Sequence, residues 1–146
     1  MSTPERSVRK PLVVGPAQGR TYEMGRMRAI FRADAEETDS RYSISEWWLE
    51  PRTPGPGPHA HPEDHIYYVL AGTVSLFLDG EWIDATRGSY ALIPGGVIHS
   101  FENRGAEECG FISINAPGGF EQRMPDIVKW FADHPLEEIA SGSAAG

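Results

Sequence analysis

The sequence is poor in cysteine, in positive charge and in long apolar runs. A single cysteine, Cys109, excludes an internal disulfide framework and a zinc site built from several thiolates. Positive charge is scarce, since 13 Lys and Arg stand against 21 Asp and Glu, and the net charge of −8 argues against binding to nucleic acid or to an anionic membrane. Long apolar runs are also missing, because the uncharged stretches 66–78 and 88–101 are shorter than the ~20 residues that cross a bilayer. The start of the chain, 1–11, is polar and charged, unlike a secretory signal, so we expect a cytoplasmic protein.

Turn-forming residues, in contrast, are abundant. The 146 residues include 16 Gly and 12 Pro, which favours many short strands over a few long helices. Asp79-Gly80 between two β-rich runs is a strong hairpin signal, because a type I′ turn needs positive φ at both positions. This pattern predicts a single all-β domain, a sandwich or a barrel. The predicted strands are 11–15, 26–33, 42–50, 65–70, 73–78, 81–85, 89–93, 98–103 and 108–114.

Other segments are predicted not to be strands. Residues 34–40 are expected to form a polar loop, and the Pro-rich 52–58 a rigid extended connection. In 117–140, apolar residues at three-to-four residue spacing predict a helix that Pro125 divides and that packs on the outside of the sheet. Residues 1–10 and 141–146 are expected to be flexible or disordered. The apolar stripe of the helix consists of Phe120, Met124, Ile127, Val128 and Phe131.

Histidine is rare, yet four of the five histidines lie between positions 59 and 99. His59, His61 and His65 share parity, so an extended segment would project all three from one face. His61 and His65 could instead lie on the first turn of a helix that starts at Pro62, but the β-branched and aromatic residues that follow favour a strand. His99 follows a Pro-Gly-Gly turn and supplies a fourth imidazole. Such a set suits a divalent transition metal, whereas Ca²⁺ and Mg²⁺ prefer oxygen ligands.

Two stretches carry these histidines in a recognisable spacing, and on them the chain resembles the cupin superfamily. The second cupin motif, at 88–103, is matched at every fixed position. The first motif, at about 53–72, is matched with two departures: Thr53 stands at the position of a glycine, and His65 at that of the metal-binding glutamate. The matched positions are His59, His61 and Gly72 in the first motif, and Gly88, Pro94, Gly96, His99 and Asn103 in the second.

The resemblance implies an antiparallel β-barrel of jelly-roll type over 11–116, with a C-terminal helix, and a homodimer. It also implies one divalent transition metal (Fe, Mn, Ni, Cu or Zn) held by His59, His61, His65 and His99. With four neutral imidazoles the metal centre has a charge of about +2, whereas a carboxylate in the ligand set would reduce it to about +1. The higher charge favours anionic oxygen donors. A metal-free cupin, whose cavity keeps these residues for packing, is the alternative.

Neighbouring residues of equal parity are expected to face the same cavity. Tyr67 is a candidate hydrogen-bond or proton donor, or else an aromatic that fills the barrel; Val69 and Phe101 are candidate pocket residues. Of the adjacent Trp47 and Trp48, one must face inward and wall the pocket, and the outward one is a candidate for a dimer interface.

Four further residues have less specific expectations. Glu63 and Asp64 are expected to be solvated loop charges, with Glu63 the first alternative ligand if His65 turns away. Asn103 is expected to form a turn. Cys109 is expected to be buried in a strand, and His134 to lie at a helix end or on the surface.

We therefore expect a metal-dependent oxidoreductase of dioxygenase type that acts on a small enolate- or phenol-like molecule in the barrel. One alternative is a non-redox isomerase, cyclase or lyase, in which Tyr67 or Glu63 transfers a proton. The other is a non-catalytic small-molecule binding module, without a DNA-binding appendage.

Overall fold

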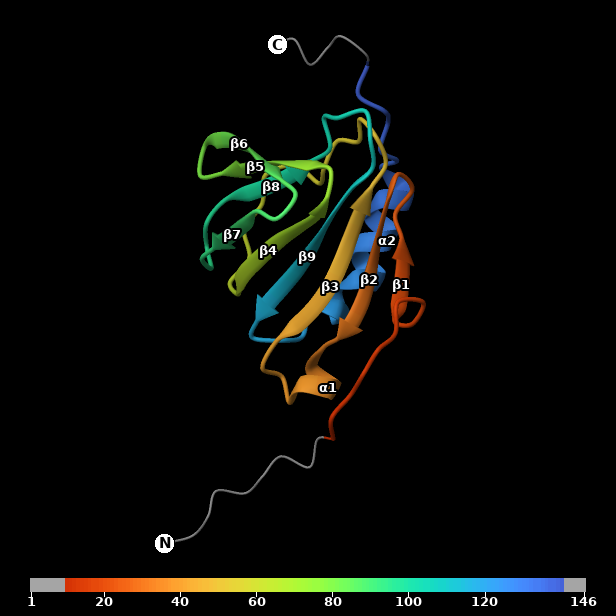
Figure 1. Cartoon of the computed structure of the whole chain (residues 1–146), viewed down its shortest axis with the longest axis vertical. Helices are drawn as coiled ribbons and strands as arrows, with labels where there is room; N and C mark the ends of the chain where they lie inside the picture. The colour runs from red at the N-terminus through yellow and green to blue at the C-terminus, as the bar shows by residue number, and fades with distance from the viewer. Residues whose placement is uncertain (1–9, 141–146) are drawn as a thin grey trace, which may run out of the picture.

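Nine strands dominate the part of the chain that this computed structural model describes, residues 10–140 (Figure 1). They form a six-stranded sheet in the order β1-β2-β3-β9-β4-β7 and a three-stranded sheet in the order β6-β5-β8, both antiparallel. This is the predicted all-β jelly roll with a C-terminal helix. The large sheet consists of β1 (Arg20–Glu23), β2 (Met27–Ala33), β3 (Ser43–Leu49), β9 (Cys109–Ala116), β4 (Asp64–Ala71) and β7 (Tyr90–Ile93). The small sheet consists of β6 (Glu81–Thr86), β5 (Thr73–Leu78) and β8 (His99–Glu102).

The core lies on the inner face of the large sheet. Along β2 and β3 every second residue is buried, which is the period expected for a sheet with one face packed and one face toward solvent. The β5–β6 hairpin turns at Asp79 and Gly80, both with positive φ (48° and 94°), as the sequence predicts. Cys109, fully buried in β9, fits its expected place.

One predicted strand near the N-terminus is wrong, and one strand there was missed. Residues 11–15 form no strand: Val13 is 91 % exposed, and the first strand of the described residues is β1 at Arg20–Glu23. Pro11 and Pro16 remove two backbone donors there, and the mostly polar residues of β1 give it little strand signal. The predicted flexible ends, 1–9 and 141–146, lie outside the described residues, and Lys10 is exposed.

The segment 34–40 is not only a loop, because it contains the one-turn helix α1 (Ala35–Thr38). Glu37 in its first turn accepts a hydrogen bond from the Asp34 backbone N–H (2.9 Å), which stabilises the helix start. The Asp34 carboxylate turns elsewhere and accepts hydrogen bonds from the backbone N–H groups of Gly119 (2.6 Å) and Glu121 (3.1 Å). α1 thus anchors the start of the C-terminal segment.

The C-terminal segment is a 3₁₀ helix, η1 (Phe120–Arg123), followed directly by α2 (Met124–Asp133). Pro125 lies in the first turn of α2, where no backbone donor is lost, so it divides the helix as predicted. The prediction that this C-terminal helix packs on the outside of the sheet is wrong. Phe120, Ile127, Trp130 and Phe131 line one cavity together with Met27 and Trp47 from the inner face of the large sheet.

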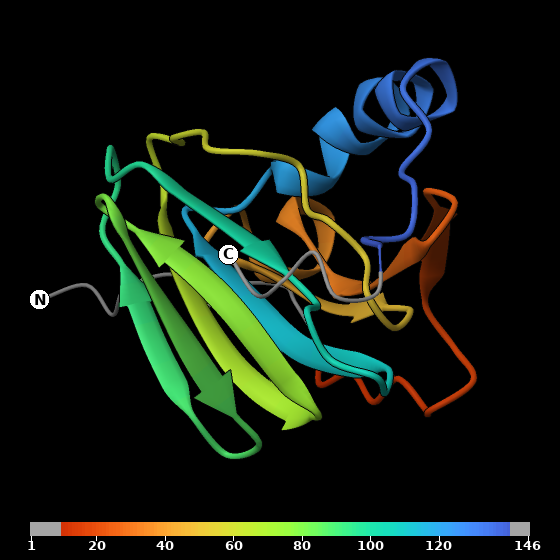
Figure 2. The same cartoon turned by 90° about the horizontal axis from the view of Figure 1, so that it is seen from above.

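Figure 2 shows the arrangement that results: η1 and α2 (blue) lie apart from the small sheet (green), and the yellow segment that precedes β4 passes between them. The two layers therefore cover different parts of the same sheet face. Within residues 10–140 no helix is long and apolar enough to cross a membrane.

Candidate metal centre

Two separate parts of the fold bring the four histidines together. His59 and His61 lie on the segment before β4, His65 lies in β4, and His99 begins β8. Of His59, His61 and His65 only His65 belongs to a strand, so the three do not form one face of a single extended strand. His59 instead pairs with His99 in an isolated bridge, with backbone N···O distances of 3.0 and 2.8 Å, and the chain bends after His61 before it enters the large sheet.

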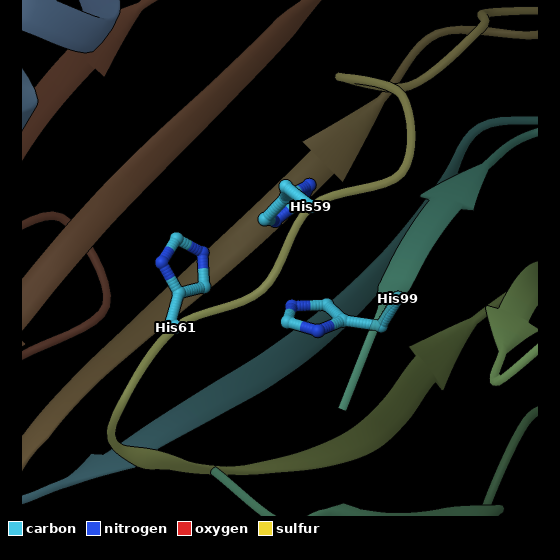
Figure 3. Close-up of side chains that lie close together, drawn as sticks. All are labelled: His59, His61 and His99. Carbon is cyan, nitrogen blue, oxygen red and sulfur yellow. The ribbon is translucent and has the colours of Figure 1, made fainter. Parts of the chain in front are cut away.

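The four rings nevertheless lie close together, and Figure 3 shows three of them, His59, His61 and His99, turned toward one another. Candidate ligand atoms lie within 4.8 Å of one another in two overlapping groups, His59–His61–His99 and His61–Glu63–His65. Ring centroids are separated by 4.7 Å (His59–His61), 4.5 Å (His59–His99), 4.9 Å (His61–His65), 5.4 Å (His61–His99) and 5.1 Å (His65–His99). The cluster is therefore compatible with a metal site.

Backbone carbonyls fix the tautomer of two imidazoles. His59 Nδ1 lies 2.7 Å from the Gly57 carbonyl oxygen, and His99 Nδ1 lies 2.9 Å from that of Val97. Because a carbonyl only accepts, Nδ1 carries the hydrogen in each ring and Nε2 presents a lone pair. Such a partner behind the ligand nitrogen is typical of metal-binding histidines.

Buried nitrogens without a partner test whether a metal fits here. Among the described residues, His99 Nε2 and both ring nitrogens of His65 are buried and make no hydrogen bond. An unpaired buried polar atom costs about 1–3 kcal/mol, so these atoms need a ligand. A divalent transition metal bound by the imidazoles would satisfy His99 Nε2 and one of the two ring nitrogens of His65, and the donor set fits such an ion.

The surroundings keep three of the imidazoles neutral, those of His61, His65 and His99. Burial lowers the pKa of His61 to about 4 and that of His65 to about 3, and the neighbouring histidines act in the same direction. Burial also lowers the pKa of His99. Since only a neutral imidazole has a free lone pair, the site is prepared to bind a cation at neutral pH.

Glu63 departs most from expectation, because it is buried, 7 % exposed, and not a solvated loop charge. Its carboxylate accepts two hydrogen bonds from Arg123 of η1, at 2.6 and 3.0 Å. Burial alone would raise the pKa of Glu63, but the guanidinium holds it below its ordinary value. Asp64 is exposed as expected and accepts a hydrogen bond from the Gly95 N–H (2.8 Å).

Three of the histidines, His59, His61 and His65, open onto a cavity of about 280 Å³ with mostly apolar walls. Trp47, Tyr67 and Phe101 line it, as predicted for pocket residues, but Trp48 and Val69 do not. Trp48 lies on the opposite face of the sheet, where the Arg28 guanidinium is 5.7 Å from its ring, and Val69 is buried in the core. The lining residues that sequence reasoning missed are Met27, Pro56, Phe111, Ser113, Phe120, Ile127, Trp130 and Phe131.

Two neutral hydroxyls are the polar groups of this lining besides the histidines and the Trp47 indole, whose N–H is already bonded to Ser45. Tyr67 and Ser113 are cross-strand neighbours on β4 and β9, each 4 % exposed. Neither side chain forms a hydrogen bond within the described residues, so both remain available to a bound molecule. Burial raises the pKa of Tyr67 far above its usual range, which makes the phenol a hydrogen-bond donor and a poor base.

Asn103 does more than form a turn. Its buried side-chain amide donates to the carbonyls of Leu49 (3.2 Å), Glu50 (3.0 Å) and Glu107 (2.8 Å), and its oxygen accepts from the Gly105 N–H (2.9 Å). Its backbone also pairs with Thr53, so the two ends of the motif region meet there. His134 ends α2 and stacks on Trp130, as expected for a helix-end residue.

The fold and the histidine cluster together place the protein in a class: small jelly-roll barrels with a candidate metal site. Residues 45–115 match the family model of the cupin domain, and the chain is a small protein of cupin fold. No curated protein sequence matches it.

Solved structures with the same fold are distant in sequence. The chain is 18 % identical to the polyketide cyclase RemF from Streptomyces resistomycificus, with a TM-score of 0.65 over 92 % of this chain and 89 % of that one. It is 17 % identical to an RmlC-like cupin from Shewanella frigidimarina (TM-score 0.66, 77 % of this chain, 96 % of that one). It is 21 % identical to a predicted oxalate decarboxylase from Thermotoga maritima (TM-score 0.65, 73 % and 99 %). These likenesses support the fold.

Proposed function

We propose that the protein is a metal-dependent oxidoreductase of dioxygenase type, acting on a small enolate- or phenol-like molecule in the cavity. One observation carries the proposal: His65, whose two ring nitrogens are unpaired, lines an apolar cavity together with His59 and His61. The other free polar groups of this lining are two neutral hydroxyls, Tyr67 and Ser113. Within the described lining there is no carboxylate or amine to act as nucleophile or base. The chemistry therefore falls to a bound metal and not to a side chain.

His59, His61, His65 and His99 would hold the metal. When bound, a redox-active divalent ion would supply the electron transfer to dioxygen and the attraction for an anionic oxygen of the substrate. With four neutral ligands, its charge of about +2 would not be reduced by the protein, which favours an enolate or phenolate.

The side chains around the cavity have separate tasks. Trp47, Phe101 and Phe111 present flat apolar surfaces suited to an aromatic ring, and they exclude water from the site. The Tyr67 hydroxyl is placed to donate a hydrogen bond to an oxygen of the bound molecule, because it has no other partner in the described residues. Substrates are thus expected to be small, flat and mostly apolar.

The test begins with elemental analysis of protein purified without added metal, followed by oxygen uptake after loading with Fe²⁺, Mn²⁺, Ni²⁺ or Cu²⁺. Small diketones, phenols and flavonol-like compounds are the substrates to try. We expect about one redox-active metal per chain and oxygen uptake with at least one compound. Native zinc together with no uptake for any metal would contradict the proposal, and protein that takes up no metal would favour a binding module.

A non-redox isomerase, cyclase or lyase is a second candidate, favoured by the Tyr67 hydroxyl as a possible proton donor. In that reaction the metal would act as a Lewis acid, and Tyr67 would protonate the carbon or oxygen of an enolate. The name of the similar polyketide cyclase indicates a substrate class, polyketides, for the corresponding trial. Conversion by the zinc-loaded protein without oxygen, lost in Tyr67→Phe, would favour this candidate.

A further inference from the structure

The Glu63 carboxylate lies close enough to the histidines to take part in the metal site. Its Oε1 is 3.9 Å from His65 Nε2, and it forms one of the two candidate ligand groups with His61 and His65. A buried carboxylate at this distance would ordinarily be attracted to a bound cation. Its neighbours therefore decide whether it becomes a ligand.

Arg123 of η1 occupies both oxygens of that carboxylate. Its two terminal nitrogens donate to Oε1 and Oε2 in a two-point contact, and the same Nη1 lies 3.3 Å from His61 Nδ1. The guanidinium lies 5.3 Å from the centre of the Phe120 ring, whose edge-on contacts with His61 (5.5 Å) and His65 (5.8 Å) connect η1 to the ligands. Arg123 thus neutralises the charge of Glu63 and takes up one lone pair on each of its two oxygens.

We propose that Arg123 is a positioning residue that determines which atoms bind the metal. By holding Glu63, it keeps the carboxylate away from the ion and leaves a ligand set made of imidazoles only. Without Arg123, the Glu63 carboxylate becomes an oxygen ligand and reduces the charge of the centre by one. This inference rests on the metal centre of the proposed function.

The reason for such an arrangement is electrostatic. A carboxylate ligand would weaken the attraction of the centre for an anionic substrate oxygen, whereas an Arg-paired carboxylate outside the ligand set leaves that attraction intact. Arg123 also belongs to the segment that forms one wall of the cavity, so the same segment contributes to this wall and to the composition of the ligand set.

Cu²⁺ is the probe for the experiment, because its electron paramagnetic resonance spectrum distinguishes nitrogen from oxygen ligands. Exchange of a nitrogen donor for a carboxylate oxygen raises g∥ and lowers the copper hyperfine splitting. The variants are Arg123→Gln, Arg123→Lys, Glu63→Gln and the double variant Arg123→Gln/Glu63→Gln. Arg28→Gln is the matched control, because Arg28 is exposed and pairs with Glu108 away from the site.

For the wild type, for Glu63→Gln and for Arg28→Gln we expect a spectrum typical of copper bound by nitrogen donors alone. Arg123→Gln is expected to show the shift toward oxygen ligation, and Arg123→Lys a smaller shift, because an ammonium group keeps the charge but not the two-point contact. The double variant is expected to return to the wild-type spectrum, since it has no carboxylate to recruit.

An unchanged spectrum in copper-loaded Arg123→Gln would overturn the inference, and so would a shift that persists in the double variant. A shift in Glu63→Gln alone would also overturn it, because Glu63 would then be a ligand in the wild type; this holds even if Arg123→Gln fails to fold. Failure of the wild type to bind copper at all would instead contradict the proposed metal centre itself.

Discussion

Burial of the histidine side chains determines how the individual residues of the site respond to pH. In an unfolded chain a histidine has a pKa of about 6.5, whereas burial lowers the pKa of His61 to about 4 and that of His65 to about 3 in the folded protein. At pH values between the folded and the unfolded pKa, the unfolded chain binds more protons than the folded protein. The free energy of unfolding of the metal-free protein is therefore highest above about pH 6.5 and decreases as the pH falls toward 4.

Urea unfolding between pH 7.5 and 4.5 measures this dependence. His65→Gln is expected to show a weaker decrease than the wild type, because one of the buried groups that take up protons on unfolding is gone. His134→Gln is the matched control at the exposed end of α2. A pH dependence in His65→Gln as steep as that of the wild type would contradict the assignment.

The Tyr67 hydroxyl gives a prediction of different effects on stability and binding. It lines the cavity and makes no hydrogen bond within residues 10–140, so Tyr67→Phe is expected to leave the free energy of unfolding nearly unchanged while it weakens substrate binding. Tyr22→Phe is the comparison, because the Tyr22 hydroxyl donates to Glu121 (2.7 Å) and its loss is expected to cost about 2 kcal/mol. Denaturant unfolding checks both, and destabilisation by Tyr67→Phe would show that its hydroxyl is already satisfied.

Residue-level prediction from the sequence succeeded where spacing carries the information. The positions of His59, His61, His65 and His99 follow a motif, and the structure brings their rings together. The burial of Glu63 could not be predicted, because its partner Arg123 is 60 residues away and belongs to an element whose position is decided by tertiary packing. Whether all four histidines bind one metal stays a prediction.

At the scale of secondary-structure elements, alternation and turn chemistry were sufficient for the strands of the two sheets from β2 onward. β1 and α1 were missed because both are short: β1 has mostly polar residues, and α1 depends on an Asp34–Glu37 contact within a single turn. The C-terminal stripe predicted a helix correctly but not the face it packs on. An apolar stripe shows that a helix has a side to bury, but it does not show which surface buries that side. Here that surface is the part of the large sheet that the small sheet leaves uncovered.

The wall that α2 adds to the cavity gives a prediction at this scale. Trp130 is 47 % exposed yet lines the cavity, and its ring is edge-on to Phe131 at 5.0 Å. Trp130→Ala is expected to change the free energy of unfolding little and to weaken binding of 2-naphthol about fivefold, or by about 1 kcal/mol, through lost apolar contact. Equilibrium dialysis measures the affinity, with the exposed neighbour Lys129→Ala as the control. Equal affinity in both variants would show that α2 does not contact the ligand.

At the scale of the whole molecule, the outer face of the large sheet is unusually apolar for a surface. One row across four strands consists of Ile44, Ile114, Ile66 and Leu92, and the next row contains Ile112, Tyr68 and Tyr90. Tyr68, Tyr90 and Leu92 are 46, 62 and 51 % exposed. Contiguous exposed apolar patches commonly mark interaction sites, which agrees with the expected homodimer.

The homodimer stays a prediction, and light scattering of the purified protein tests it. We expect twice the mass of one chain for the wild type. Leu92→Glu is expected to shift the protein toward the monomer, because it places a charge within the apolar row, whereas the exposed Lys129→Glu on α2 should leave the mass unchanged. A monomeric wild type would contradict the expectation, and a dimeric Leu92→Glu would place the contact elsewhere.

The position of η1 and α2 has a consequence for how this protein could acquire new ligands. The histidines of the candidate metal site lie within residues 45–115, which match the cupin domain, whereas four lining residues of the cavity come from 120–133, after that match. The strands of the barrel and the helical segment that forms one wall of the cavity are thus encoded in separate, contiguous stretches. A chimaera that exchanges 124–133 and keeps Arg123 would alter the shape of the cavity while the histidines and their sheets stay the same, so ligand range could diversify without rebuilding the metal site.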